Sequence, residues 1–207
     1  MRDKPVEEER LRMYRRSLLA LWLATAAAFA AGGTWQPTEV VSSTGDWVVR
    51  HRGWIDAAVM LVCGAFLFIF AQGVWHGSSA ARRKAIEPAF DRLVFLLPVT
   101  RRERRWWVAL SLTAGICEEM LYRGYLLHLL DERTGLAGAW LLSSLAFGFA
   151  HLYQGWKGIA SATATGLLFG LLAIGTGGLV LPIVVHVLVD LQMLWMYRPG
   201  TPGNSSE

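Results

Sequence analysis

The chain has 207 residues, of which 54% are hydrophobic and only 17% are charged, with ten tryptophans and two cysteines. Both cysteines, Cys63 and Cys117, lie inside apolar stretches, which excludes a small secreted domain held together by disulfides. The net charge of +4 would suit nucleic-acid binding, but the basic residues flank long apolar segments. This pattern is typical of a membrane protein that is oriented by its flanking charges, and we expect no nucleic-acid partner.

Apolar stretches recur along the whole chain and predict an all-α, polytopic transmembrane helix bundle of about six spans. Each stretch is near the ~20 residues that a helix needs to cross the hydrocarbon core. Alternation with a period of two is absent from them, which argues against a membrane barrel. The stretches are Ser17–Thr34, Trp54–Trp75, Trp106–Leu130, Ala137–Tyr153, Gly158–Gly175 and Leu179–Met196.

The first stretch has two interpretations. It follows Arg15 and Arg16 and is succeeded by small residues, as in a cleavable signal peptide. A long amino-terminal region that contains the acidic run 7–9 precedes it, which favours a retained span.

The distribution of basic residues predicts the orientation of the chain. Six lysines and arginines precede the first span and eight lie between Arg82 and Arg105, whereas the connection Gln36–Arg52 carries two. The positive-inside rule therefore places the amino terminus and the Arg82–Arg105 connection in the cytoplasm. Within this connection, Phe90–Val99 is apolar but too short to span, and we expect it to form an interfacial segment along the membrane.

Charged and imidazole side chains interrupt the third, fourth and sixth spans. A charged residue at the centre of a bilayer costs about 2.5–3.5 kcal/mol on insertion scales, so such residues usually face one another or a wet cavity. They therefore predict a functional site inside the bundle. The residues are Glu118, Glu119, Arg123, His151, His186 and Asp190.

The spacing of these residues predicts which of them interact. Glu119 and Arg123 are four residues apart on one helix face and are expected to form an ion pair. Glu118 is turned by about 100° from Glu119 and is free to point elsewhere. His186 and Asp190 are also four apart, so either both point at one target or Asp190 only holds His186 in one tautomer.

One carboxylate and two imidazoles in a membrane cavity suit hydrolysis of a peptide bond. Glu118 would act as general base toward a water held with His151, and Phe147 lies one helical turn before that histidine. His186 and Asp190 would stabilise the oxyanion, which requires either a protonated Asp190 or a donating His186 that Asp190 orients.

The same residue types are also zinc ligands. Glu118, His151 and His186 could hold zinc with an open position for water, although the chain contains no HExxH motif. A metal-free glutamate mechanism without a cofactor is the first expectation, and a zinc-dependent protease is the alternative.

Three motifs carry a resemblance to a known family. They are EExxxRG from Glu118, FxxxH from Phe147 and HxxxD from His186, in this order on separate apolar helices. Together they resemble the CPBP family of CAAX proteases and bacteriocin-processing enzymes, also called Abi or Rce1-like intramembrane proteases. The resemblance covers Trp106 to Trp195, somewhat under half of the chain.

The resemblance implies a glutamic-type intramembrane endopeptidase. Glu118 and His151 would activate water, His186 and Asp190 would form the oxyanion site, and Glu119, Arg123 and Phe147 would support them. In the CAAX-processing branch the position of Asp190 is usually asparagine, although aspartate also occurs in the family. The fuller family fold has eight spans, against six expected here.

The family also suggests the substrate, the location and the division of the chain. We expect a membrane-anchored protein or peptide as substrate, through CAAX-type, bacteriocin-leader or carboxy-terminal sorting-anchor processing, in the bacterial inner membrane. Residues 106–197 would form a four-span catalytic core, residues 1–105 the preceding spans and basic connection, and residues 198–207 a polar tail. The alternatives are a non-catalytic membrane scaffold or bacteriocin-immunity protein and, lower in rank, a proton-coupled transporter.

Overall fold

The structure is a computed structural model that describes residues 4–32, 50–91 and 93–198. All regular elements in these ranges are helical, and a helix covers each of the six predicted spans. The elements are α1 (Lys4–Gly32), α3 (Arg52–Gly77), α4 (Ala80–Ile86), the 3₁₀ turn η1 (Glu87–Phe90), α5 (Arg101–Glu119), the π-helix η2 (Met120–Leu126), α6 (Leu127–Ala150), the 3₁₀ turn η3 (Leu152–Gln154), α7 (Gly155–Thr176) and α8 (Val180–Met196).

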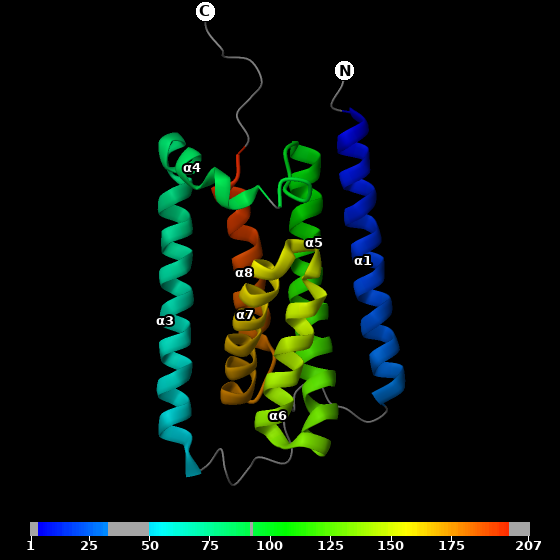
Figure 1. The fold of residues 1–207 in the computed structure, drawn as a ribbon, viewed down its shortest axis with the longest axis vertical. Helices are drawn as coiled ribbons and strands as arrows, with labels where there is room; N and C mark the ends of the chain where they lie inside the picture. Colours follow the sequence, from blue (N-terminus) through cyan, green and yellow to red (C-terminus); the bar gives the residue numbers. More distant parts are fainter. Residues whose placement is uncertain (1–3, 33–49, 92, 199–207) are drawn as a thin grey trace, which may run out of the picture.

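The long helices stand side by side in one bundle (Figure 1). Helix α5 packs against α1 and α8, and α8 packs against α3 and α7. Helices α6 and α7 form an antiparallel hairpin whose turn lies well short of the start of α1, the end of α3 and the start of α5 (Figure 1). The prediction of an all-α membrane helix bundle is confirmed.

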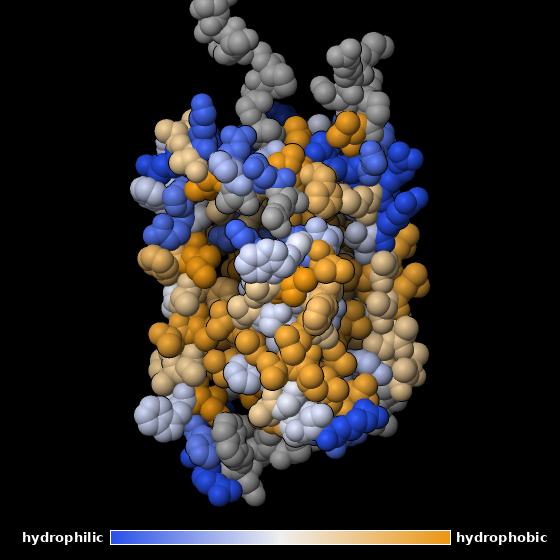
Figure 2. Space-filling model, in the orientation of Figure 1, coloured by the Kyte–Doolittle hydropathy of each residue, from blue (hydrophilic) through white to orange (hydrophobic). Residues whose placement is uncertain are grey.

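The surface of the bundle is apolar around its middle and hydrophilic at both ends (Figure 2). Large apolar side chains such as Leu61, Phe68 and Trp54 are 64–80% exposed. Two helical segments, 52–77 and 152–176, are long and apolar enough to cross a membrane by length and composition alone. Such an exposed apolar band suits contact with lipid, because soluble monomers rarely expose large contiguous apolar patches.

The third and fourth predicted spans meet at a single glycine. Helix α5, η2 and the first turns of α6 continue one another up to Gly135, where φ is 69° and ψ is 167°. This positive φ is open to glycine without a steric penalty, so the chain reverses there with almost no loop.

We call the end of the bundle that contains the start of α1, α4 and the start of α5 the basic end. There, α1 docks on α5 through a salt bridge of 2.6 Å between Arg10 and the fully buried Glu103. Glu103 also accepts hydrogen bonds from the backbone N–H groups of Val99 and Thr100, and Thr100 caps α5 in return. This capping box fixes the position where α5 begins.

The segment Phe90–Val99 differs in part from the prediction of an interfacial element. Phe90 ends η1, and the described residues that follow it form turns, with Pro98 before the cap of α5. Phe90 and Leu97 are buried in the protein, and the Tyr14 hydroxyl donates to the Leu96 carbonyl. The segment is therefore anchored to α1 by its own backbone, while Val94 and Phe95 stay exposed.

Candidate functional site

Glu119 is the centre of the buried polar cluster. Its Oε1 atom lies 2.8 Å from Nη1 of Arg123 and 2.9 Å from Nδ1 of His186. Glu119 and Arg123 are completely buried and His186 is 6% exposed. The predicted Glu119–Arg123 ion pair is present, and the same carboxylate also fixes His186, a role that the sequence suggested only for Asp190 and only as one of two alternatives.

The other ring nitrogen of His186 faces two further carboxyl groups. Nε2 lies 3.8 Å from Oε2 of Glu118 and 3.9 Å from Oδ2 of Asp190. These separations are too long for direct hydrogen bonds, and Oε2 of Glu118 is buried without a hydrogen-bond partner among the described residues. Three carboxyl groups from α5 and α8 thus surround one imidazole.

A change of helix type separates Glu119 from Arg123. Helix α5 ends at Glu119, and the π-helix η2 begins at the next residue and contains Arg123. Short π-helical turns are rare and occur frequently at functional sites.

A hydrogen bond joins α5 to α8 beside the cluster. The Trp107 indole on α5 donates to the backbone carbonyl of Asp190 at 3.1 Å, which fixes α8 against α5.

Aromatic rings enclose Arg123 and His186. The Arg123 guanidinium lies 4.4 Å from the ring centroid of Phe147 and 5.4 Å from that of Phe169. Phe169 stacks on His186 at 5.0 Å, and Phe147 contacts the same imidazole edge-on at 6.0 Å. The Gly166 carbonyl accepts a hydrogen bond of 3.1 Å from Arg123.

Two members of this enclosure were not identified from the sequence. Gly166 and Phe169 are absent from the site residues that the sequence predicts. They lie three residues apart on α7. A side chain at residue 166 would meet Arg123 and Phe147, so the glycine allows close packing and also exposes the carbonyl that binds Arg123.

His151 lies at the edge of this cluster, at the end of α6. Its Nδ1 is 2.9 Å from the Phe147 carbonyl, and its ring is 4.7 Å from the Phe147 ring. Because a carbonyl only accepts, Nδ1 carries the hydrogen and Nε2 of a neutral ring keeps its lone pair. His151 is within electrostatic range of His186, but among the described residues no hydrogen bond joins it to Glu118.

The predicted site residues therefore fall into two groups. Glu118, Glu119, Arg123, His186 and Asp190 form one contact network across α5, η2 and α8. His151 reaches this network through Phe147, which touches both histidine rings.

The zinc alternative requires three ligands around one point. In the described part of the chain, no group of three or more His, Cys, Asp or Glu side chains is arranged to hold a metal ion. Nδ1 of His186 is bound to Glu119, and Nδ1 of His151 is bound to the Phe147 carbonyl. These bonds leave Nε2 of each histidine available, and zinc-ligating histidines usually donate the other ring N–H in this way, so zinc stays the alternative to the metal-free mechanism.

The bundle and its buried charged cluster define a polytopic membrane protein with a polar site between its helices. Residues 101–192, from α5 into α8, match the family described as type II CAAX prenyl endopeptidase Rce1-like. The match includes every residue of the cluster.

A curated relative agrees with this family. The chain is 27% identical over 135 residues to the Bacillus subtilis (strain 168) protein named "Putative membrane peptidase YdiL". The alignment covers 65% of this chain and 54% of that protein, so the chain spans about half the length of the relative. No solved structure matches the chain. The family match and the relative agree with the resemblance to the CPBP family that the sequence motifs predict.

Proposed function

We propose that the protein is an intramembrane endopeptidase that hydrolyses a peptide bond of a membrane-associated protein or peptide. The observation that carries the proposal is the buried His186, whose Nδ1 is bound to Glu119 while Nε2 faces Glu118 and Asp190. A carboxylate beside an imidazole is suited to activate a water and to polarise a substrate carbonyl. The description of the matched family and the printed name of the curated relative support this class of activity.

In the proposed mechanism, Glu118 is the general base. Its carboxylate takes a proton from a water as the water oxygen attacks the peptide carbonyl carbon, and it then returns the proton to the departing amine. His151 accepts the second hydrogen bond of that water through Nε2, because Nδ1 is bound to Phe147. Glu118 is suited to this role because its Oε2 is buried and accepts no hydrogen bond from the part of the chain that the structure describes.

His186 and Asp190 stabilise the oxyanion in this mechanism. Since Nδ1 of His186 points at Glu119, Nε2 can donate to an oxyanion only when the ring is doubly protonated. Arg123 and this imidazolium would balance two of the three carboxylates, and a proton on Asp190 would balance the third. Asp190 would then donate to the oxyanion rather than repel it.

The glutamate and histidine roles are tested by comparing Glu118→Gln and His151→Ala with wild type in cleavage of membrane-anchored reporter peptides. Candidate reporters carry a CAAX-type terminus, a bacteriocin-type leader or a carboxy-terminal sorting anchor. General acid–base groups typically contribute 10²–10⁴-fold, so both variants should lose at least about 100-fold in rate. Glu132→Gln is the matched control, because Glu132 is exposed and outside the cluster.

Two further outcomes separate the alternatives. Cleavage that persists in both variants would refute the mechanism and favour a non-catalytic scaffold or immunity role. Loss of wild-type activity in a strong chelator, restored by zinc, would refute the metal-free mechanism.

The proposed setting is the bacterial inner membrane, with the amino terminus and the basic end in the cytoplasm. Residues 106–197 would be the catalytic core, and residues 1–105 would hold it in the membrane; the polar tail predicted at 198–207 lies outside the described residues except for Arg198. The turn of the α6–α7 hairpin stops short of the basic end, so these two helices do not extend to that end of the bundle (Figure 1). The substrate would therefore reach Glu118 from the cytoplasmic half of the bilayer.

A further inference from the structure

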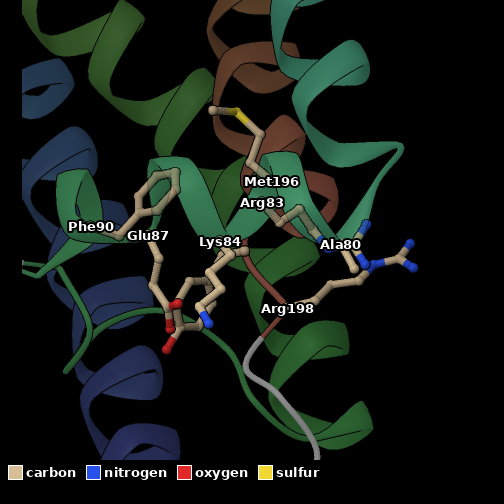
Figure 3. A pocket seen from close by; sticks show the side chains of 8 residues that line it. Ala80, Arg83, Lys84, Glu87, Phe90, Met196 and Arg198 are labelled. Carbon is tan, nitrogen blue, oxygen red and sulfur yellow. The ribbon is translucent and has the colours of Figure 1, made fainter.

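A cavity of about 400 Å³ lies at the basic end, away from the buried cluster. It is formed where α4 and η1 cross the end of α8 (Figure 3). Its lining includes Arg83, Lys84, Glu87, Phe90, Met196 and Arg198. Its volume is within the range of roughly 300–1,000 Å³ that is typical of small-molecule sites.

The cavity carries uncompensated positive charge. Three cations line it, against the single carboxylate of Glu87. In the described part of the chain neither Lys84 nor Arg198 forms a salt bridge, and Arg83 donates to the Gly77 carbonyl, which holds its side chain in place.

A fourth cation adds to this potential. Arg104 precedes the predicted third span and donates to the Leu194 carbonyl at 2.6 Å. Burial, followed by the repulsion of Arg198, lowers the pKa of its guanidinium. Three lining cations, with Arg104 near Arg198 and one lining carboxylate, form a site that a negatively charged group would stabilise.

The position of the cavity points to a lipid as the source of that negative group. Trp75 and Trp195, at the adjacent ends of α3 and α8, are 54% and 47% exposed, as is usual for tryptophans at the membrane–water interface. Phe90 and Met196 give the cavity an apolar wall on the side of the bundle. The cations thus lie at the expected level of the lipid headgroups, next to apolar surface.

We propose that this cavity binds the phosphodiester headgroup of an anionic phospholipid at the basic end of the bundle. The guanidinium and ammonium groups would donate charge-assisted hydrogen bonds to the phosphate oxygens. The glycerol and the first carbons of the acyl chains would lie against Phe90 and Met196. The lipid would join α4 to the end of α8, and its binding does not depend on the proposed peptidase activity.

The test titrates detergent-solubilised protein with phosphatidylglycerol and follows the midpoint of thermal unfolding. Phosphatidylcholine and inorganic phosphate are titrated in parallel. The variant is Lys84→Glu/Arg198→Glu, and the control is Arg12→Glu/Arg16→Glu, which changes the net charge equally on the exposed face of α1. Phosphatidylglycerol should stabilise wild type and the control, and the Lys84/Arg198 variant should need at least roughly tenfold more lipid.

Three outcomes would overturn the proposal. Equal weakening in both variants would indicate nonspecific attraction by surface charge. Stabilisation by inorganic phosphate at the same concentrations would indicate a free-anion site, and equal stabilisation by phosphatidylcholine would indicate no headgroup selectivity. If the charge reversals prevent folding, the variant Lys84→Gln/Arg198→Gln takes their place. It should also need more phosphatidylglycerol than wild type, by a smaller factor.

Discussion

Arg123 is the residue on which the geometry of the cluster depends. It is fully buried and binds the Glu119 carboxylate and the Gly166 carbonyl, with the faces of Phe147 and Phe169 on either side. Cation–π contacts strengthen when they are desolvated, so the aromatic rings replace part of the hydration that the guanidinium gives up. By neutralising Glu119, Arg123 lets that carboxylate hold His186 inside the bundle.

Replacing Arg123 by methionine should lower the free energy of unfolding by about 3–5 kcal/mol, because it leaves a buried carboxylate without its cation. Thermal unfolding in detergent would measure this loss. The double variant Glu119→Gln/Arg123→Met removes the unpaired charge and should recover part of the stability. An Arg123→Met protein as stable as wild type would show that the ion pair does not support the fold.

The sequence predicted the pairing within one helix and the convergence of the charges, but it did not predict which side chains of different helices touch. The Glu119–Arg123 pair follows from four-residue spacing, and the convergence of charges follows from the cost of exposing them to lipid. The Glu119–His186 contact and the Phe169 stack depend on how α5, α7 and α8 are rotated about their axes. Helices that are apolar on nearly every face give no hydrophobic periodicity from which that rotation could be predicted.

Helices α6 and α7 approach each other closely at glycines. A side chain at Gly148 would lie 2.9 Å from the backbone carbonyl of Ile159 and would collide with Thr163. Small residues at such contacts are typical of membrane helices, where close packing rather than the hydrophobic effect drives association. This contact holds the end of α6, and therefore His151, in place.

Gly148→Ala should destabilise the protein by about 1–3 kcal/mol, because the backbone of α7 has to move to admit the methyl group. Gly64→Ala is the matched control, since a methyl group there meets nothing within 4 Å. The two variants would be compared by thermal unfolding in the same detergent. Equal stability of both would mean that α6 and α7 can separate without cost.

At the level of elements, the apolar stretches predicted from the sequence coincide with helices of the structure. Hydrophobic length was sufficient for this, since a membrane span has few alternatives to a helix. The π-helix η2 was not predicted, because one wide turn leaves no trace in hydrophobicity. The turns of 93–99 were not predicted either, because their conformation depends on α1 packing against them.

At the scale of the whole molecule, helix α1 lies outside the family-matched residues 101–192 and packs against α5, which begins that region. Two salt bridges link α1 to the start of α5: the buried Arg10–Glu103 pair and the Arg102–Glu8 pair, whose side chains are 54% and 53% exposed. A buried pair is costly to break, whereas an exposed pair contributes roughly 0–1 kcal/mol. The two bridges are therefore expected to differ strongly in importance.

Glu103→Ala should cost about 3–5 kcal/mol, because it leaves Arg10 unpaired and removes the acceptor for two backbone N–H groups. Glu8→Ala should cost no more than about 1 kcal/mol. Hydrogen exchange resolved along α1 would show faster exchange only in the Glu103 variant. Identical exchange in the two variants would show that α1 is held by apolar packing alone.

The orientation of the site residues depends on the exact number of residues in the π-helix η2. Each residue of an α-helix advances the direction of the side chains by about 100°, so deleting one residue from Met120–Leu126 would rotate Glu118 and Glu119 relative to everything that follows. Loops elsewhere can gain or lose residues without changing the orientation of distant side chains. We therefore expect insertions and deletions to be tolerated at the connections of this bundle and excluded from the seven residues that follow Glu119.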